Sequence, residues 1–291
     1  LINKTGAWRF FKPLFVTRAS PCAQACPIGQ RLARAFMFVE IGQWRSALET
    51  LMEENPFPAI MGRICYHPCQ NQCNRREFDG EISIRSLERA IGDFAPSSGI
   101  ETKPLRTPSG KHVGIVGAGP AGLSCAYHLI RLGHRVTVYD SNVDPGGMLR
   151  YGIPAYRLPR DVLNREIDRL ERSGVIFKTG LHVGHDIELA DLAQQHDALF
   201  AAVGAWKSRA LKIRGEQLPG VHSGLEFLRR VNEGKIPRAQ GRVAVIGGGN
   251  TALDVARCLA RIGAEPVVIY RRTAAEMPAF LEEVEHALAE G

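Results

Sequence analysis

Seven cysteines are the residues of this sequence best suited to metal or redox chemistry. Five of them lie before residue 74, in two groups about 40 residues apart. The groups read PCAQACP and CYHPCQNQC, and their cysteines are Cys22, Cys26, Cys65, Cys69 and Cys73. Closely spaced thiolates, with a proline next to one of them, are typical ligands of iron–sulfur clusters. The spacing therefore predicts an iron–sulfur site in the N-terminal part of the chain.

Two other uses of these cysteines stay open. Four thiolates also suit a structural zinc ion, and cysteines in an oxidising compartment can pair as disulfides. His67 lies between two of the cysteines and is expected to be a loop residue or to lie behind the ligands. Cys125 and Cys258 sit in apolar helical patterns, where cysteine is usually a small core residue.

The sequence GAGPAG, residues 117–122, follows a strand-like segment at 113–116 and opens a helix-like segment at 121–132. Its first glycine allows a tight turn, its second lets the backbone approach a pyrophosphate, and its third permits close helix–strand packing. The helix N-terminus offers free N–H groups to the phosphates. Asp140 follows a second strand at 136–139, 23 residues after the first glycine, and can bind ribose hydroxyls. This unit is predicted to bind a dinucleotide.

Two features favour FAD in this first unit. Pro120 stands in the turn, and DPGG at residues 144–147 places a second glycine pair just beyond the acidic strand end. That pair would let backbone amides approach the flavin-side phosphate and ribitol. The residues expected to bind FAD are Gly117, Gly119, Pro120, Ala121, Gly122, Asp140, Gly146, Gly147, Met148 and Leu149.

A second glycine-rich turn, GGGNTA at residues 247–252, repeats the pattern about 130 residues later. Its strands are expected at 243–246 and 267–270, and its helix at 251–261. Aligning the two units places Arg271 where the first unit has Asp140, with one extra residue in between. Because a guanidinium suits a 2′-phosphate, this predicts a preference for NADP over NAD, with a solvated turn as the alternative. The residues expected to bind it are Gly247, Gly249, Asn250, Thr251, Ala252, Arg271 and Arg272.

Two such units in one chain predict a bound flavin and a diffusible nicotinamide nucleotide. Hydride transfer between them depends on proximity and orientation more than on a protein acid or base, so no catalytic side chain is predicted. No Cys-x-x-Cys pair lies near the flavin unit, which disfavours a dithiol relay of the thioredoxin reductase type.

The fold class predicted is α/β, with a helical N-terminal iron–sulfur domain and two nested Rossmann-like units, the second incomplete at its C-terminus. Apolar spacing predicts helices at 33–41, 44–52 and 83–94, and the composition of residues 95–110 predicts a linker. The predicted domains are the cluster domain (1–106), the first part of the FAD-binding domain (107–240) and the start of the NAD(P)-binding domain (241–291).

The composition and charge of the chain bear on its partners and its location. The net charge of +7 fits either an arginine-rich solvated surface or attraction for an anionic partner, and no nucleic-acid motif is found. No apolar stretch is long enough to span a membrane, and the first residues do not read as a secretory signal, so a cytoplasmic location is expected. The chain begins at Leu1 rather than methionine, which suggests a fragment or a processed product.

Motifs along nearly the whole chain resemble the small (beta) subunit of glutamate synthase and its relatives, including the N-terminal half of dihydropyrimidine dehydrogenase. They include PCAQACP, NPFPAIMGRICYHPCQNQC, GIVGAGPAGLSCAYHL, GGMLRYGIPAYRLP, VIGGGNTALDVARCLARIGA and YRRTAAEMPA. The resemblance implies FAD at the first unit, NAD(P)H at the second and a [4Fe-4S] cluster in the cysteine domain. It also implies a partner subunit that accepts or donates electrons, and hence a hetero-oligomer.

The resemblance also bears on the cluster ligands. Relatives commonly hold two clusters and carry an extra Cys-x-x-Cys upstream, where this chain has Leu14 and Thr17. Five cysteines exclude two all-cysteine clusters, so one [4Fe-4S] cluster is expected. Its expected ligands are Cys26, Cys65 and Cys69, with Cys22 or Cys73 as the fourth. Glu88 stands where a relative uses a non-cysteine ligand and is an alternative.

The leading hypothesis is an oxidoreductase subunit that passes electrons between NAD(P)H, FAD and the cluster, to or from a partner protein. Relatives return to the FAD fold after the nicotinamide unit, and this sequence lacks that return. The alternative is therefore a non-catalytic assembly subunit with an inactive flavin fold. A zinc-stabilised nucleotide sensor is a third hypothesis, and the partner's substrate is not encoded here.

Overall fold

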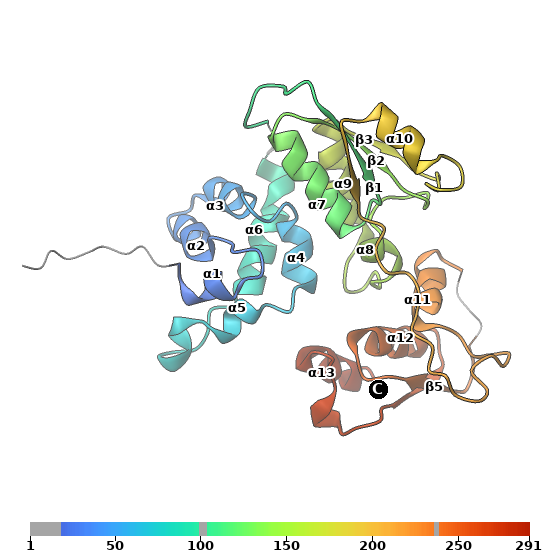
Figure 1. Cartoon of the computed structure of the whole chain (residues 1–291). Coiled ribbons are helices and arrows are strands. Elements are labelled where there is room, and N and C mark those ends of the chain that lie inside the picture. The colour runs from blue at the N-terminus through green and yellow to red at the C-terminus, as the bar shows by residue number, and fades with distance from the viewer. Residues whose placement is uncertain (1–18, 99–103, 236–238) are drawn as a thin grey trace, which may run out of the picture.

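The computed structural model describes residues 19–98, 104–235 and 239–291. A helical region with the clustered cysteines precedes a four-stranded parallel sheet and a two-stranded parallel sheet (Figure 1). The predicted fold class is confirmed. Leu14 and Thr17 lie outside the described residues. No helix within the described ranges is both long and apolar enough to cross a membrane.

The cysteine region consists of short helices around a common core. They are α1 (Pro21–Ala25), α2 (Leu32–Glu40), α3 (Trp44–Leu51), α4 (Pro58–Ile64), α5 (Pro68–Asn71), the 3₁₀ turn η2 (Asn74–Glu77) and α6 (Ile84–Ser98). The three expected helices correspond to α2, α3 and α6. The linker prediction is wrong for residues 95–98, which continue α6. Ile91 and Phe94 anchor this helix in the core, and that packing outweighs the loop-like composition of the last turn.

Two glycines bring α4 and α6 into backbone contact. A Cβ added at Gly62 would lie 2.4 Å from the Arg89 backbone, and one at Gly92 would lie 2.2 Å from the Ala59 nitrogen. Only glycine permits this approach. The close crossing sets the end of α4, where Cys65 lies, beside the face of α6 that carries Glu88.

The first nucleotide-binding unit has a four-stranded sheet of order β3-β2-β1-β4, in which all neighbouring strands are parallel. Its strands are β1 (His112–Val116), β2 (Arg135–Tyr139), β3 (Val175–Lys178) and β4 (Ala198–Ala201). Its helices are α7 (Pro120–Arg131), α8 (Met148–Tyr151), α9 (Arg160–Arg172) and α10 (Leu189–Gln195). The glycine-rich turn follows the inner strand β1, at the carboxyl edge where open parallel sheets bind ligands.

The second unit repeats strand, helix and strand in the predicted places. Its elements are α11 (Gly224–Asn232), β5 (Arg242–Ile246), α12 (Asn250–Arg261), β6 (Glu265–Ile269), the 3₁₀ turn η3 (Ala274–Glu276) and α13 (Leu281–Ala289). Strands β5 and β6 are parallel, with Ile246 opposite Ile269. A small separate core forms between α11 and α12 around Leu228 and Leu259. The predicted duplication is therefore present in the structure, with strand bounds within two residues of those expected.

The cysteine region is joined to the first unit by bonds to main-chain carbonyl groups. The Tyr127 hydroxyl donates to the Met52 carbonyl at 2.7 Å, and Arg131 donates to the same oxygen at 3.2 Å. Arg169 donates to the carbonyl of Pro56. The Met52 carbonyl lies at the end of α3, where a helix leaves carbonyls without partners, and Tyr127 and Arg131 of α7 supply them. The Pro56 carbonyl lies in the loop before α4, and α9 binds it there.

Candidate functional site

The turn after β1 has room for glycine alone at its first and third glycine positions. Gly117 has a φ of +111°, and a Cβ there would lie 2.2 Å from the carbonyl oxygen of Ala202. A Cβ at Gly122 would lie 1.9 Å from the Gly117 oxygen, so α7 packs directly on the turn. At Gly119 the nearest atom would be 3.9 Å away, which leaves its backbone open. These are the three roles predicted for the glycines of a dinucleotide turn.

The second glycine pair lies against this turn. The Gly146 N–H donates to the Ala118 carbonyl at 2.8 Å, and a Cβ at Gly147 would lie 2.6 Å from the Gly119 Cα. The two turns thus meet backbone to backbone, and α8 begins directly after them at Met148. Among the other residues predicted here, Pro120 and Ala121 are exposed, Met148 is half-buried and Leu149 is buried in the main core.

Asp140 is buried and lies beside the same turn. Its Oδ2 accepts from the Ala118 N–H at 2.6 Å, and its Oδ1 accepts from the main-chain and side-chain nitrogens of Asn142 at 2.8 and 2.9 Å. A carboxylate offers about four acceptor positions. The group is therefore held in one orientation while acceptor capacity remains for a ribose hydroxyl, and the site fits the adenosine half of FAD.

The second glycine-rich turn is also open towards a ligand. Gly247 has a φ of +139°, and its N–H donates to the Ile269 carbonyl at 2.9 Å. A Cβ at Gly249 would meet nothing within 4 Å, so the start of α12 is accessible. Thr251 is exposed and Ala252 half-buried. This open helix N-terminus, at the carboxyl end of β5, fits a pyrophosphate group.

Polar side chains surround this second turn. The Asn250 Oδ1 accepts from the Phe280 N–H at 3.0 Å, which fixes the segment before α13. Arg271 and Arg272 are exposed and follow β6 within three residues of its end. Tyr270 takes the position that Asp140 has in the first unit, directly after the strand, and the two arginines follow it.

In the cysteine region, three thiols and one carboxyl group lie close together. Burial, followed by the charges of Cys65, Cys26 and Glu88, raises the pKa of Cys69 to about 12. The pKa of Cys65 is likewise raised by burial and by the charges of Glu88 and Cys26. Because charges act at this strength only between near neighbours, Cys26, Cys65, Cys69 and Glu88 form one group. A bound iron would hold these thiols deprotonated, as metals do.

The other two cysteines of the predicted set lie in α1 and just after α5, and these two helices pack against each other. Cys22 is in α1, where its Sγ lies 3.1 Å from the Ser20 hydroxyl. Cys73 follows α5 and is half-buried beside the start of η2. The charges named for Cys65 and Cys69 include Cys26 and Glu88. Glu88 is therefore a candidate companion of the three central thiols, beside Cys22 and Cys73.

Glu88 is held by two amide groups that the sequence did not single out. Its Oε1 accepts from the Gln30 side chain at 2.9 Å and from the Asn55 side chain at 2.6 Å. The side chain is 5% exposed, and burial raises its pKa. Gln30 and Asn55 lie 58 and 33 residues away, so no local pattern could have identified them. Both amide groups donate to the same oxygen, Oε1, and so fix the orientation of the carboxyl group.

This geometry bears on the three possible uses of the cysteines, which are an iron–sulfur cluster, a zinc site and disulfides. All seven cysteines are free, so disulfides are not formed. Among the described residues, no three His, Cys, Asp or Glu side chains converge closely enough for a single metal ion. The four ligands of a zinc ion must converge on one point, whereas those of a cubane cluster bind different irons and stand further apart.

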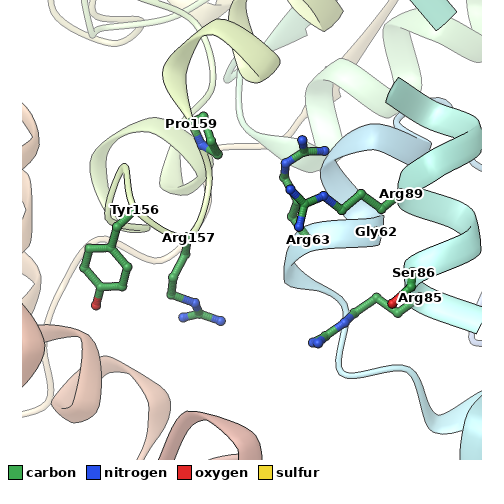
Figure 2. Close-up of a pocket in the computed structure, with 8 residues that line it drawn as sticks. All are labelled: Gly62, Arg63, Arg85, Ser86, Arg89, Tyr156, Arg157 and Pro159. Atoms are coloured by element: carbon green, nitrogen blue, oxygen red, sulfur yellow. The ribbon is translucent and has the colours of Figure 1, made fainter. Parts of the chain in front are cut away.

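A small cavity of about 160 Å³ lies away from both turns, between the cysteine region and the loop before α9. Its lining residues are Gly62, Arg63, Arg85, Ser86, Arg89, Tyr156, Arg157 and Pro159 (Figure 2). Carboxylates neutralise its four arginines: Asp93 pairs with Arg63 and Arg89, Glu282 with Arg85, and Asp254 with Arg157. The cavity is therefore a junction of ion pairs rather than a free anion site.

One of these arginines joins the two nucleotide-binding units. Arg157 contacts Asp254 of α12 at 2.8 Å and Glu283 of α13 at 3.0 Å. Glu283 also pairs with Arg257, whose guanidinium lies 4.5 Å from the ring centroid of Tyr156. Burial raises the pKa of Asp254 to about 6, although Arg157 acts to lower it. The segment YGIPAYRLP, noted so far only as a family resemblance, is thus the buried contact between the units.

Comparison with known protein families agrees with this division of the chain. The profile of the pyridine nucleotide-disulphide oxidoreductases matches residues 111–290. The profile of dihydropyrimidine dehydrogenase domain II, described by its 4Fe-4S cluster, matches residues 16–100. These matches confirm the predicted cofactors FAD, NAD(P) and a [4Fe-4S] cluster at the level of the families.

Individual relatives confirm the predicted resemblance. The chain is 38% identical to NADP(+)-dependent formate dehydrogenase subunit beta of Moorella thermoacetica, covering 97% of this chain and 43% of the relative. It is 37% identical to NADPH-Fe(3+) oxidoreductase subunit beta of Geobacter sulfurreducens, covering 94% and 42%. It is 37% identical to the glutamate synthase [NADPH] small chain of Mycobacterium tuberculosis, covering 84% and 53%. The chain spans about half the length of these relatives.

Among solved structures, the chain is similar to the His57Gln mutant of FprA from Mycobacterium tuberculosis. The TM-score is 0.54 at 25% identity, and the match covers 63% of this chain and 48% of FprA.

The contact between the units gives a test of the structure. Replacing Arg157 by methionine leaves Asp254 buried without its cation, and breaking such a pair costs about 3–5 kcal/mol. We expect denaturant titration to show this loss in unfolding free energy. The loss should shrink as the pH is lowered towards 6, because a buried Asp254 with a raised pKa is then neutralised by protonation.

The matched control for Arg157→Met is Arg165→Met. Arg165 pairs with Asp161 in the same unit, but the two side chains are 43% and 67% exposed. Exposed pairs contribute less than about 1 kcal/mol. Equal losses in the two variants would contradict a buried contact at Arg157.

Proposed function

Because the chain belongs to the pyridine nucleotide-disulphide oxidoreductase family, we propose that it is the electron-transfer part of an oxidoreductase subunit. It passes electrons between NAD(P)H, FAD and one [4Fe-4S] cluster, to or from a partner protein. The observation that carries this proposal is the joining, in one chain, of two open glycine-rich turns to a group of partly or fully buried thiols. Neither an assembly subunit nor a nucleotide sensor requires all three.

The first unit holds FAD in this proposal. The turn at Gly117 and Gly119 and the start of α7 bind the pyrophosphate, and Asp140 accepts from the ribose. The pair Gly146 and Gly147 approaches the flavin-side phosphate, with Met148 and Leu149 following. FAD, when bound, converts a two-electron hydride into single electrons. The protein supplies position and shields the exchange from water.

The second unit holds the nicotinamide nucleotide. The backbone at Gly247 and Gly249 leaves the N-terminus of α12 accessible to a pyrophosphate. Asn250, whose side chain is already fixed by the Phe280 N–H, borders this position. Arg271 and Arg272 would bind a 2′-phosphate, because two guanidinium groups suit a dianion. NADPH is accordingly the proposed electron donor or product.

The cysteine region holds the cluster. We assign Cys26, Cys65 and Cys69 as ligands and Glu88 as the fourth, with Cys22 and Cys73 as the alternatives. The support is that the charges of Cys26 and Glu88 help raise the pKa of both Cys65 and Cys69, and that two amides orient Glu88. A carboxylate ligand adds the negative charge that a thiolate would have brought.

The remaining parts of the proposal concern organisation. Domains at 1–106, 107–240 and 241–291 are supported by the starts of β1 at His112 and β5 at Arg242. Helix α11, within the second of these ranges, packs on α12 of the third. A partner subunit is supported by the relatives, whose names describe beta subunits or small chains. Free cysteines around a cluster suit a reducing compartment, and we propose the cytoplasm.

The first experiment is anaerobic purification followed by a visible spectrum with and without reduced nucleotide. We expect flavin bands on a broad iron–sulfur shoulder, bleached by NADPH at lower concentration than by NADH. A colourless protein, or a spectrum that neither nucleotide changes, would overturn the proposal in favour of an assembly subunit.

The proposed preference for NADPH over NADH is tested by a separate double variant. Replacing both Arg271 and Arg272 by alanine should weaken NADPH binding by about 10- to 100-fold, because hydrogen bonds to a charged group contribute about 1.5–3 kcal/mol. NADH binding should change little. Arg242→Ala, an exposed arginine at the start of β5, is the control. Equal losses for both nucleotides would show that these arginines do not bind a 2′-phosphate.

The ligand set is tested by the iron and acid-labile sulfide bound to single variants. Cys26→Ser, Cys65→Ser and Cys69→Ser should each lose most of the cluster, since a structural metal site depends on its full ligand set. Glu88→Ala should lose it to a similar extent, whereas Cys22→Ser and Cys73→Ser should retain it. Cys125→Ser, far from the group, is the control. A full cluster in Glu88→Ala, with loss in Cys22→Ser or Cys73→Ser, would refute the fourth ligand.

A further inference from the structure

The segment between η3 and α13 is attached to the second glycine-rich turn. The Ala279 N–H donates to the Gly248 carbonyl at 3.1 Å, and the Phe280 N–H donates to the Asn250 side chain at 3.0 Å. Gly248 and Asn250 flank the open position at Gly249 where the nucleotide phosphates are proposed to bind. If the backbone of this turn moves when a ligand binds, residues 279 and 280, which are hydrogen-bonded to it, move with it.

The same segment contacts the cysteine region on its other side. The ring of Phe280 stacks on Tyr66 with centroids 5.2 Å apart and planes 10° from parallel. The carboxylate of Glu282 pairs with Arg85. The backbone N–H of Arg85 in turn donates to the Gln70 side chain at 3.0 Å. The segment thus bridges two regions that are far apart in sequence.

Both contacts end next to proposed cluster ligands. Tyr66 directly follows Cys65, and Gln70 directly follows Cys69. Arg85 and Cys65 also line the same cavity at this junction. The arginine that pairs with Glu282 thus borders a space that a proposed cluster ligand also borders.

These contacts are isolated rather than part of a continuous core. A cavity of about 520 Å³ lies beside them, lined by both sides of the junction, including Cys65, His67 and Glu285. Tyr66 is 50% exposed and Phe280 38% exposed. An interface made of one aromatic stack and one part-exposed ion pair can loosen and close without unfolding either region.

We infer that residues 279–282 couple nucleotide binding at the second glycine-rich turn to the redox state of the cluster. The inference rests on the proposed function. A cluster held by Cys65 and Cys69 would gain one negative charge on reduction. That charge would attract Arg85 away from Glu282 and loosen the segment that holds Asn250. By linkage, a nucleotide that binds the two redox states with different affinity must shift the cluster's midpoint potential by the corresponding amount.

The test is a redox titration of the cluster followed by electron paramagnetic resonance, with and without saturating 2′-phospho-ADP-ribose. This probe carries the pyrophosphate and the 2′-phosphate but has no nicotinamide, so it takes no electrons. We expect the probe to bind the two redox states with affinities that differ at least about fivefold, which is typical of coupled sites. At 59 mV per tenfold change for one electron, this is a shift of about 40 mV.

Two variants remove the bridge, and each has a matched control. Phe280→Ala removes the stack but keeps the main-chain bond to Asn250, and Glu282→Gln removes the charge paired with Arg85. Each should reduce the shift to less than half. The controls are Phe78→Ala, an exposed phenylalanine of the cysteine region, and Glu265→Gln, an exposed residue at the start of β6 in the nucleotide unit. Both controls should keep the full shift.

The outcomes separate this inference from the function on which it rests. A cluster signal and tight probe binding with no potential shift in the unaltered chain would overturn the coupling and leave the proposed function standing. A full shift in both Phe280→Ala and Glu282→Gln would show that the coupling runs elsewhere and would also overturn the inference. Absence of a cluster signal or of probe binding in the unaltered chain would overturn the proposed function itself.

Discussion

The loop after α3 is the constraint on which the arrangement of the cofactor sites depends. Its carbonyl groups at Met52 and Pro56 accept hydrogen bonds from Tyr127 and Arg169 of the first nucleotide-binding unit. Within the same loop, Asn55 donates to Glu88 at the cluster site. Because these main-chain oxygens are buried at the junction, leaving them unpaired would cost about 1–3 kcal/mol each. The flavin unit and the cluster site are thus held by opposite sides of one short segment.

The second unit is attached differently. The buried ion pairs of Arg157 fix it to the first unit, while its contact with the cysteine region consists of the Tyr66–Phe280 stack and the Arg85–Glu282 pair. The flavin–cluster junction is therefore fixed by many buried bonds, and the nucleotide–cluster junction by a few exposed ones. A diffusible substrate must enter and leave, and a bound cofactor must not. The difference between the two junctions matches that requirement.

The nucleotide-binding turns could be predicted from the sequence because their chemistry is local. Gly117 and Gly122 are required by contacts within a few residues or with the neighbouring strand, and the strand–helix–strand pattern around them repeats in the second unit. The two cysteine groups could be predicted for the same reason, because their spacing can be read directly from the sequence. The continuation of α6 through residue 98 was missed, because tertiary packing of Ile91 outweighed a composition typical of linkers.

The partners that orient the site could not be predicted. Gln30 and Asn55 reach Glu88 from 58 and 33 residues away, and Arg157 reaches Asp254 across 97 residues. A single sequence carries no signal for such pairs, because either partner alone looks like an ordinary polar residue. Even the segment GGMLRYGIPAYRLP was noticed only as a resemblance, and its role as the contact between the two units became visible in the structure.

The central claim is that electrons from NADPH reach the cluster only by way of the flavin. It is tested by mixing NADPH rapidly with the chain in FAD-loaded and FAD-depleted forms and freezing samples for electron paramagnetic resonance. The account predicts that the signal of the reduced cluster develops in the FAD-loaded form and is absent from the depleted form. A reduced-cluster signal without FAD, or a bleached flavin beside a cluster that stays oxidised, would contradict it.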